Sequence, residues 1–312
     1  MNAVAPPILL AGPTASGKSA LALALAEALG GAVINADSQQ VYADWRVLSA
    51  RPSAAEEARA PHRLYGHLPL DAPYSVGRWL RELAPVLAAC RSDGLRPIIT
   101  GGTGLSFRAL TEGLHDIPES PPEIRSACEA ALAREGVARF AETLAARDPA
   151  TAAEIDLANP ARLLRAAEVL EATGRGLAAW RATRPEPLLP RNDTIRLALR
   201  PEREALYARC DRRFDTMIAE GALEEVASVL ARGLPPSLPG MKALGARELT
   251  AHLEGRTSLA EAAEAARTAT RQYAKRQLTW IRNQMTDWTV LPGPDPQAAL
   301  EVIAAASHGP RT

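Results

Sequence analysis

The chain has 312 residues, of which 47% are hydrophobic and 23% are charged, values that are ordinary for a globular protein with one large domain or two modest ones. Its 36 basic and 36 acidic residues cancel, which excludes a general electrostatic attraction of the whole chain to nucleic acid. Any nucleic-acid site must therefore come from local segregation of charge.

The three cysteines, Cys90, Cys128 and Cys210, lie far apart and form no C-x-x-C pair. This spacing argues against a zinc site or a disulfide framework and is typical of a reducing cytoplasm. The N-terminus lacks the basic region of a signal peptide, and no apolar run approaches the length of a membrane span. We therefore expect a cytoplasmic protein without membrane contact, and we expect it to act as a monomer.

The first predicted elements are a strand over residues 7–11 and a helix over residues 20–29, joined by a glycine loop. The loop matches G-x-x-x-x-G-K-[ST] at every defined position, in the strand–loop–helix context that a phosphate-binding loop needs. Backbone N–H groups and the helix dipole attract phosphate there, Lys18 adds a full charge, and Ser19 can hold Mg²⁺. An ordinary strand-to-helix turn is the alternative. The predicted di- or triphosphate-binding residues are Gly12, Pro13, Thr14, Ala15, Ser16, Gly17, Lys18 and Ser19.

Further apolar runs predict strands over residues 32–36, 96–100, 194–199 and 287–291, and predicted helices separate most of them. This βαβ pattern indicates an α/β fold, a P-loop NTPase-like parallel sheet flanked by helices. Ligands of such sheets bind at the carboxyl ends of the strands. We therefore expect Asp37–Gln40 and Gly101–Gly104 to meet the phosphate-binding loop in one crevice.

Asp37 directly follows the second predicted strand. A carboxylate there can help to bind Mg²⁺ or act as a general base on an acceptor, and its alternative role is to cap a helix. The strand over residues 96–100 runs into Gly-Gly-Thr and not into the aspartate of a Walker-B strand, and no N-K-x-D sequence occurs. These absences argue against a GTPase or a motor ATPase and leave a small-molecule kinase that uses ATP as an alternative.

Between residues 117 and 187 prolines mark both flanks, and the interior is rich in Ala, Leu, Glu and Arg without a strand-like run. We predict an all-helical insertion domain over residues 117–187, within a core domain made of residues 1–116 and 188–312.

Helices are predicted over residues 202–232, 244–254 and 258–284, and the last dozen residues are expected to fray. Arg267, Arg271 and Lys275 share one face of the last long helix, which is either a solvated surface or a weak nucleic-acid signal. Tyr273 and Trp280 on the same helix either stack on a base or pack into the core.

These pieces together resemble the tRNA dimethylallyltransferases, also called tRNA isopentenyltransferases. The matching stretches run in the family's order: Gly12–Ser19, Asp37–Tyr42, Pro61-His62, Gly101–Leu105, Arg162–Ala166 and Thr270–Trp280. Leu48-Ser49-Ala50-Arg51-Pro52 stands where the family often has Gly-Thr-Ala-Lys-Pro, and Ser106 and Ala246 stand where tyrosine is usual.

The resemblance implies transfer of a dimethylallyl group from dimethylallyl diphosphate to N6 of the adenosine on the 3′ side of a tRNA anticodon, with diphosphate as the leaving group. It implies Asp37 as the base, Lys18 and Thr103 as further catalytic residues, and Mg²⁺ at Ser19. The partners would be the anticodon stem-loop of a tRNA and the allylic diphosphate. The tRNA contacts that it implies are Asp37, Ser38, Gln39, Gln40, Thr103, Arg125, Ala161, Arg162, Leu163, Leu164, Arg165, Lys242, Arg247, Arg271, Lys275 and Arg276.

Overall fold

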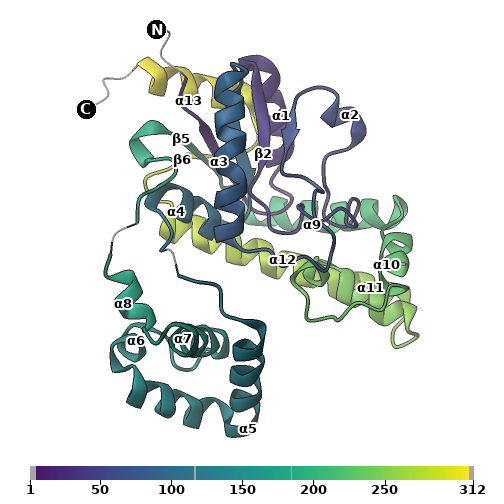
Figure 1. Cartoon of the computed structure of the whole chain (residues 1–312). Helices are drawn as coiled ribbons and strands as arrows, with labels where there is room; N and C mark the ends of the chain where they lie inside the picture. Colours follow the sequence, from purple (N-terminus) through teal and green to yellow (C-terminus); the bar gives the residue numbers. More distant parts are fainter. Residues whose placement is uncertain (1–4, 116, 184, 309–312) are drawn as a thin grey trace. The chain divides into compact units, whose positions relative to one another are not determined.

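A computed structural model describes residues 5–115, 117–183 and 185–308, and these divide into two units (Figure 1). The first unit comprises Met1–Thr111 and Leu188–Thr312, and the second comprises Glu112–Pro187. The division after residue 187 lies where the sequence predicted it. The earlier division lies at residue 112 instead of 117, and residue 116, where the predicted boundary falls, is outside the described residues.

The first unit is built on a six-stranded sheet with the order β3-β2-β4-β1-β5-β6, in which every pair of neighbours is parallel. The strands are β1 (Ile8–Ala11), β2 (Gly31–Asn35), β3 (His62–Arg63), β4 (Arg96–Gly101), β5 (Ile195–Leu199) and β6 (Thr289–Leu291). The five predicted strands are confirmed. The two residues of β3 are too few to give a hydrophobic pattern, so the sequence did not reveal that strand.

Helices cover both faces of this sheet, which is why β1 and β2 are buried along their whole length. Ile8 and Leu10 pack in one cluster with α1 (Lys18–Leu29) and α13 (Pro296–His308), whereas Leu9 packs in another with α3 (Val76–Ser92) and α4 (Gly104–Glu112). Alternate residues of the central strand thus belong to opposite layers, and α1 and α3 lie on opposite faces (Figure 1).

The remaining helices of the first unit follow the sheet strands or connect them. They are α2 (Ala54–Glu57), α9 (Arg203–Ala219), α10 (Ala222–Leu230), α11 (Ala246–Leu253) and α12 (Leu259–Gln284), with short 3-10 helices η1 (Arg191–Asp193) and η2 (Pro239–Lys242). The helix predicted over residues 202–232 is two helices, because Gly221 between them adopts a φ of +99° that a helix does not allow.

The expectation that the last dozen residues fray is wrong for residues 301–308, which continue α13. Ala299 and Ile303 explain why, since both side chains are buried against α1 and the sheet. Residues 309–312 lie outside the described residues.

The second unit consists of helices throughout its described part: α5 (Pro122–Arg147), α6 (Pro149–Glu154), α7 (Pro160–Thr173) and α8 (Leu177–Arg181). α5 is kinked at Gly136, whose φ of 76° and ψ of 164° are not helical. Its two halves pack with α7 around a core that includes Cys128, Phe140 and Leu163. Within the described residues of both units, no helix is long and apolar enough to cross a membrane.

Candidate active site

The phosphate-binding loop lies between β1 and α1 and has the backbone that its glycines predict. Ala15 and Gly17 have positive φ values of 59° and 87°, and a methyl group on Gly12 would come within 2.7 Å of Ser16 Oγ. α1 begins at Lys18 after Gly17, and no side chain caps its first turn. The N–H groups of that turn are therefore available to an anion.

Three cations surround this loop, and the sequence identified only one of them. Burial lowers the pKa of Lys18 to about 8, although the charge of Asp37 opposes this shift, and Lys18 Nζ donates to the Pro13 carbonyl at 3.2 Å. From α9, Arg209 Nε donates to the Ala15 carbonyl at 2.9 Å, and Arg213 Nη1 donates to Thr14 Oγ1 at 3.2 Å. Burial also lowers the pKa of Arg213.

The sequence contains one signal for Arg209 and Arg213, although it does not place them at the loop. They are four residues apart on a predicted helix, and that helix directly follows the strand that pairs with β1. Spacing alone did not show that this face of the helix meets the loop.

Asp37 is held at the end of β2 by its own neighbours. Its N–H donates to Asn35 Oδ1 at 2.8 Å, and its Oδ1 accepts the N–H of Gln39 at 2.9 Å. No helix starts here, because the following residues form turns and α2 begins only at Ala54, so the helix-capping alternative is wrong. Burial raises the pKa of Tyr273 on α12 to about 12, and the charge of Asp37 contributes to this increase.

One cavity of about 1100 Å³, lined only by residues of the first unit, joins these groups. Its walls come from the phosphate-binding loop, residues 37–40, residues 46–51, α9, residues 242–244 and one side of α12. The predicted site residues that line it are Thr14, Ala15, Ser16, Gly17, Lys18, Ser19, Asp37, Ser38, Gln39, Gln40, Lys242 and Arg276. The predicted residues of the first unit that do not line it are Gly12, Pro13, Thr103, Arg247, Arg271 and Lys275.

Residues 46–51 form one wall of the cavity and include Leu48 and Ser49, where the sequence differs from the Gly-Thr that the resembled family often has. Glu225 on α10 accepts hydrogen bonds from three successive backbone N–H groups, those of Arg46, Val47 and Leu48, at 2.6, 3.0 and 2.8 Å. Gln40 Nε2 donates to the Ser49 and Ala50 carbonyls at 3.0 and 2.8 Å. The side-chain amide of Gln40 therefore helps to hold residues 49 and 50 in the cavity wall, and its Nε2 donates to these protein carbonyls.

The basic face of α12 is largely neutralised by ion pairs. Arg271 contacts Asp211 at 2.7 Å and Glu264 at 2.9 Å, and Arg267 contacts Asp215 at 2.7 Å. These hydrogen bonds raise the pKa of both arginines. The interpretation as a solvated, paired surface therefore describes this face better than a free basic patch.

The two aromatic residues of α12 have different environments. Tyr273 lines the cavity, with the guanidinium carbon of Arg276 5.5 Å from the centre of its ring. Trp280 packs into the core cluster over β1 and β4, where a methyl group on Gly104 would overlap with its indole nitrogen. Tyr273 thus borders the cavity, whereas Trp280 is a packing residue.

The Gly101–Gly104 turn lies beside the end of β2, because a methyl group on Gly101 would come 2.6 Å from the backbone of Ala36. The Thr103 hydroxyl is buried and has no hydrogen-bond partner among the described residues. Because Thr103 does not line the cavity, its role in catalysis stays a prediction.

The comparisons with known proteins bear directly on this site. The family model described as "IPP transferase" matches residues 40–284, and the model described as "Isopentenyl transferase" matches residues 7–67. The chain belongs to the IPP transferase family. This family assignment agrees with the resemblance inferred from the sequence.

Curated relatives and solved structures of this family align over most of the chain. A tRNA dimethylallyltransferase of Cereibacter sphaeroides is 58% identical over 282 residues, which cover 90% of this chain and 94% of the relative. One of Dinoroseobacter shibae is 55% identical, covering 92% and 94%. The full-length tRNA isopentenylpyrophosphate transferase of Bacillus halodurans shares 30% identity with a TM-score of 0.69, covering 97% of this chain and 96% of that chain. A eukaryotic dimethylallyltransferase acting on tRNA shares 26% identity with a TM-score of 0.80, covering 96% and 77%.

In the second unit of this IPP transferase, two predicted tRNA-contacting arginines flank one buried carboxylate. Arg125 Nε and Arg165 Nη1 lie 3.9 and 3.8 Å from the carboxylate oxygens of Glu168. Ala161 and Arg162 at the start of α7 are exposed. Leu164 is half-buried against the core of this unit.

The prediction that Leu163 contacts tRNA is wrong for its side chain. Leu163 is 0% exposed and packs in the hydrophobic core of the second unit, so its side chain cannot reach a ligand at the surface. The helical period explains the difference, because on α7 only one side faces the solvent.

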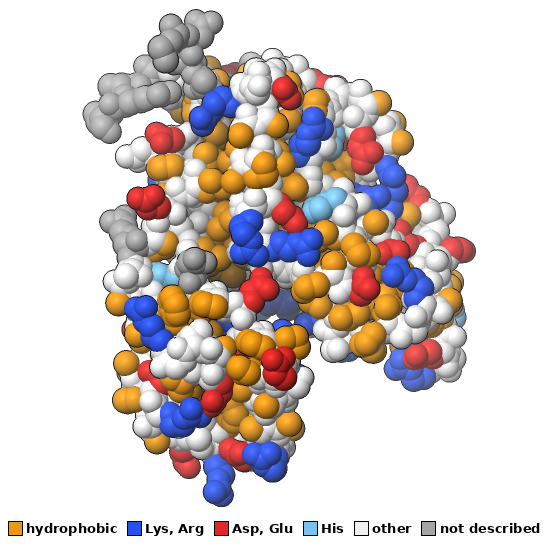
Figure 2. Space-filling model, viewed as in Figure 1, with side chains coloured by type: hydrophobic (Ala, Val, Ile, Leu, Met, Phe, Trp, Pro, Cys, Tyr) orange, Lys and Arg blue, Asp and Glu red, His pale blue; other side chains and the backbone are white. Residues whose placement is uncertain are grey.

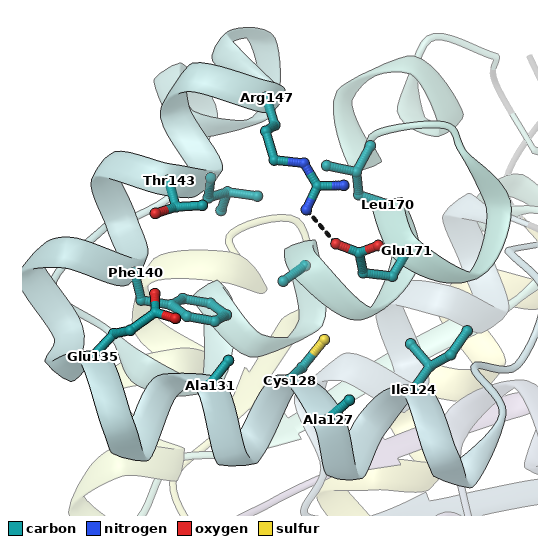
Figure 3. Close-up of a pocket in the computed structure, with 12 residues that line it drawn as sticks. Ile124, Ala127, Cys128, Ala131, Glu135, Phe140, Thr143, Arg147, Leu170 and Glu171 are labelled. Atoms are coloured by element: carbon teal, nitrogen blue, oxygen red, sulfur yellow. Dashed lines mark hydrogen bonds and ion pairs between the residues drawn. The ribbon is translucent and has the colours of Figure 1, made fainter.

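A second cavity, of about 360 Å³, lies inside the second unit between the two halves of α5 and α7 (Figure 3). Ile124, Cys128 and Phe140 contribute to its apolar wall, and the Arg147–Glu171 ion pair lies at its edge. Among the described residues, its lining contains no buried polar side chain that lacks a hydrogen-bond partner.

The described residues include no group of three or more His, Cys, Asp or Glu side chains that could hold a metal ion. Near the phosphate-binding loop, the oxygen ligands that line the cavity include the exposed Ser19 hydroxyl and the Asp37 carboxylate. This set fits Mg²⁺ only where a bound diphosphate and water supply most of the ligands, which is a common arrangement for this ion.

Proposed function

We propose that this chain is a tRNA dimethylallyltransferase, which transfers a dimethylallyl group from dimethylallyl diphosphate to N6 of the adenosine 3′ to the anticodon and releases diphosphate. The observation that carries the proposal is the single cavity in which a cationic phosphate loop and Asp37 face each other beside Tyr273. The named relatives support the transferase over the kinase alternative.

The phosphate-binding loop would hold the diphosphate of the donor. As the allylic C–O bond breaks, negative charge grows on the departing oxygen. The N–H groups of the first turn of α1 lie where they can stabilise that charge, together with Lys18, Arg209 and Arg213. The Thr14 hydroxyl, which accepts from Arg213, gives the cradle a further donor.

Asp37 would serve as the base. The adenine N6 amine is a weak nucleophile because its lone pair is delocalised into the ring. As the N–C bond forms, the proton on N6 passes to the Asp37 carboxylate, and the electrons of the broken C–O bond leave with the diphosphate. The hydrogen bond from Gln39 N–H fixes the orientation of this carboxylate.

The acceptor adenine must turn out of the anticodon loop to reach this cavity, and stacking repays part of that unfavourable step. Tyr273 offers a ring face for stacking, and Ser38 and Gln39 offer polar groups to the base edge. Lys242, Arg276, Arg247 and Lys275 are exposed cations that can meet the RNA backbone. Arg271 would have to break its ion pairs with Asp211 and Glu264 to bind the RNA backbone, so we expect it to contribute less to RNA binding than the exposed cations do.

We further propose that Mg²⁺ accompanies the diphosphate at Ser19. When bound, the ion would neutralise part of the diphosphate charge. The residues of the chain would hold it through the Ser19 hydroxyl, with Asp37 close enough to the loop to act electrostatically.

The test is mass analysis of nucleosides from unmodified tRNA incubated with the protein and dimethylallyl diphosphate. The wild-type chain should convert adenosine to N6-dimethylallyladenosine without consuming ATP. Asp37→Asn should lower kcat about 10²- to 10⁴-fold, the range for a lost general base, while tRNA still binds. Asp71→Asn, at an exposed carboxylate outside the cavity lining, is the matched control and should behave as wild type.

A near-normal rate for Asp37→Asn would refute the assignment of the base. ATP consumption by the wild-type chain with no change in the tRNA would refute the transferase and favour the kinase.

A further inference from the structure

A single side chain on α12 connects the two glycine loops of the site. Gln277 is 6% exposed, its Oε1 accepts the N–H of Thr14 at 2.8 Å, and its Nε2 donates to the Gly102 carbonyl at 2.9 Å. Both ends of the amide are therefore engaged, one by the phosphate-binding loop and the other by the turn that carries Thr103. A buried amide whose oxygen and nitrogen both have hydrogen-bond partners has a defined orientation.

The fit around Gln277 explains the glycines of the Gly101–Gly104 turn. Gly102 and Gly104 do not have positive φ values, so conformational freedom is not the reason for glycine there. A methyl group on Gly102 would overlap with Gln277 Nε2, and one on Gly104 would overlap with Trp280 Nε1. The two residues are glycines because α12 packs directly against the backbone of the turn.

The hydrogen bond from Thr14 also changes the composition of the phosphate cradle. Because the Thr14 N–H points to Gln277, it is not one of the amides that face the phosphate. Thr14 instead presents its hydroxyl, which accepts from Arg213. Gln277 thus determines which group of Thr14 faces the donor.

On the same helix, Tyr273 precedes Gln277 by one turn and lines the cavity, with Arg276 next to Gln277 in sequence. The helix that offers the stacking ring for the acceptor is therefore the one that holds the donor loop in place.

We propose that Gln277 is a positioning residue for the transfer reaction: it holds the diphosphate cradle at Thr14 and the turn of Thr103 in one fixed relation, so that the leaving group and the acceptor are aligned. This inference rests on the proposed function. Its removal should lower the rate of the chemical step more than the affinity for the donor, because the cradle amides of α1 and Lys18 are untouched.

The decisive variant is Gln277→Glu, which has nearly the same size. The carboxylate can still accept from Thr14 N–H, but it faces the Gly102 carbonyl without a proton to donate. We expect kcat at about pH 8 to fall about tenfold to a hundredfold, as for a small misplacement of reacting groups, with the donor KM within about threefold of wild type. Gln284→Glu, at an exposed position of α12, is the matched control and should keep the wild-type kcat.

Acidification adds a readout that a purely structural role would not move. The protonated carboxyl of the variant can donate to Gly102 as the amide does, so the ratio of variant to wild-type kcat should rise as the pH is lowered from about 8 to about 5.5. Using the ratio removes the effect of protonating Asp37, which is common to both proteins.

Equal kcat for Gln277→Glu and wild type at every pH would overturn the inference. A loss that does not depend on pH and is matched by an equal loss of donor affinity would also overturn it, because that pattern describes general damage to the fold. Wild-type protein is assayed in parallel. If it leaves tRNA unmodified, the proposed function itself fails, and the inference fails with it.

Discussion

Lys18 is the residue whose charge at physiological pH depends most on where the chain places it. In water a lysine keeps its proton to above pH 10, but burial brings the pKa of Lys18 to about 8. The nearby Asp37 carboxylate opposes this shift, and Arg213 adds to it. The substrate-free site is therefore close to losing one of its cations in mildly alkaline solution.

This shift predicts a pH dependence of donor binding. The diphosphate binds the charged form of Lys18, so its affinity should be complete below about pH 8 and should fall, at most tenfold per pH unit, above it. Calorimetric titration of diphosphate between about pH 7 and 10 measures this. Stability should change in the opposite sense: between about pH 8 and 10.5 the unfolded chain binds more protons at this group, so its contribution to the unfolding free energy rises with pH.

Lys18→Arg is the control, because arginine stays charged throughout this range. Its diphosphate affinity, whatever its absolute value, should show no break near pH 8. If the diphosphate affinity of both proteins falls above about pH 8, the titrating group is not Lys18.

At the residue scale, the sequence predicted the groups that belong to a local motif and missed those that reach the site from afar. Gly12–Ser19 and Asp37 could be found because a loop and a strand end determine their positions. Arg213 and Gln277 are adjacent to Thr14 only in the folded chain, separated from it by 199 and 263 residues. The Leu163 error has the same origin, since a resemblance marks a stretch but not which of its side chains point inward.

At the scale of elements, α10 holds the cavity wall of residues 46–51 through Glu225, which does not itself line the cavity. Its carboxylate accepts three consecutive N–H groups, which converge as they do around a bound anion. The wall that it holds carries Leu48 and Ser49 in place of the residues usual in the family, and Ser49 Oγ donates to the Trp45 carbonyl. The substituted wall is thus a hydrogen-bonded structure of its own.

Glu225→Ala should therefore loosen this wall. Losing the shared acceptor leaves three amides without their partner, and we expect the free energy of unfolding in urea to fall by about 1 to 3 kcal/mol. Glu224→Ala, at an exposed position on the same turn of α10, should change it by less than about 0.5 kcal/mol. Equal effects of the two substitutions would show that the three hydrogen bonds contribute nothing specific.

Most elements were predictable because hydrophobic periodicity determines them. The strands β1, β2, β4, β5 and β6 and the helices α1, α11 and α12 fall within a few residues of their expected positions. What the sequence did not show is how α12 pairs its charges, since Asp211 and Asp215 come from α9, another helix of the first unit. The net charge of one helix face cannot be predicted until the acidic residues of the helix packed against it are known.

At the scale of the whole molecule, the 36 basic and 36 acidic residues give a net charge of zero. Basic and acidic side chains lie side by side over the face drawn in Figure 2. The net charge of zero requires equal numbers of the two kinds but does not require this mixing. Recognition of RNA by this protein would therefore depend on a few exposed cations around the cavity, and should weaken with salt less steeply than for strongly basic proteins.

The two units have separate hydrophobic cores, which predicts separable effects of core mutations. Leu163→Ala should destabilise the second unit by about 2 to 5 kcal/mol and accelerate amide hydrogen exchange over residues 122–173. Exchange over β1 and α1, and the affinity for diphosphate, should stay unchanged. Val137→Ala, at an exposed position of the second unit, is the control. A parallel loss of diphosphate affinity in Leu163→Ala would show that the two units do not fold independently.

The phosphate-binding loop precedes in the chain the segments that complete its structure. β1 needs β5 beside it, Thr14 needs Gln277, and Gly17 lies against Pro294, whose ring a methyl group there would approach to 2.7 Å. While the ribosome is still adding α12, the phosphate-binding loop already has its full sequence motif but lacks the hydrogen bond from Thr14 to Gln277. We therefore expect the loop to bind phosphate groups only after α12 has been synthesised. A polypeptide that ends before α12 would carry an intact phosphate-binding sequence, and we expect it not to bind diphosphate.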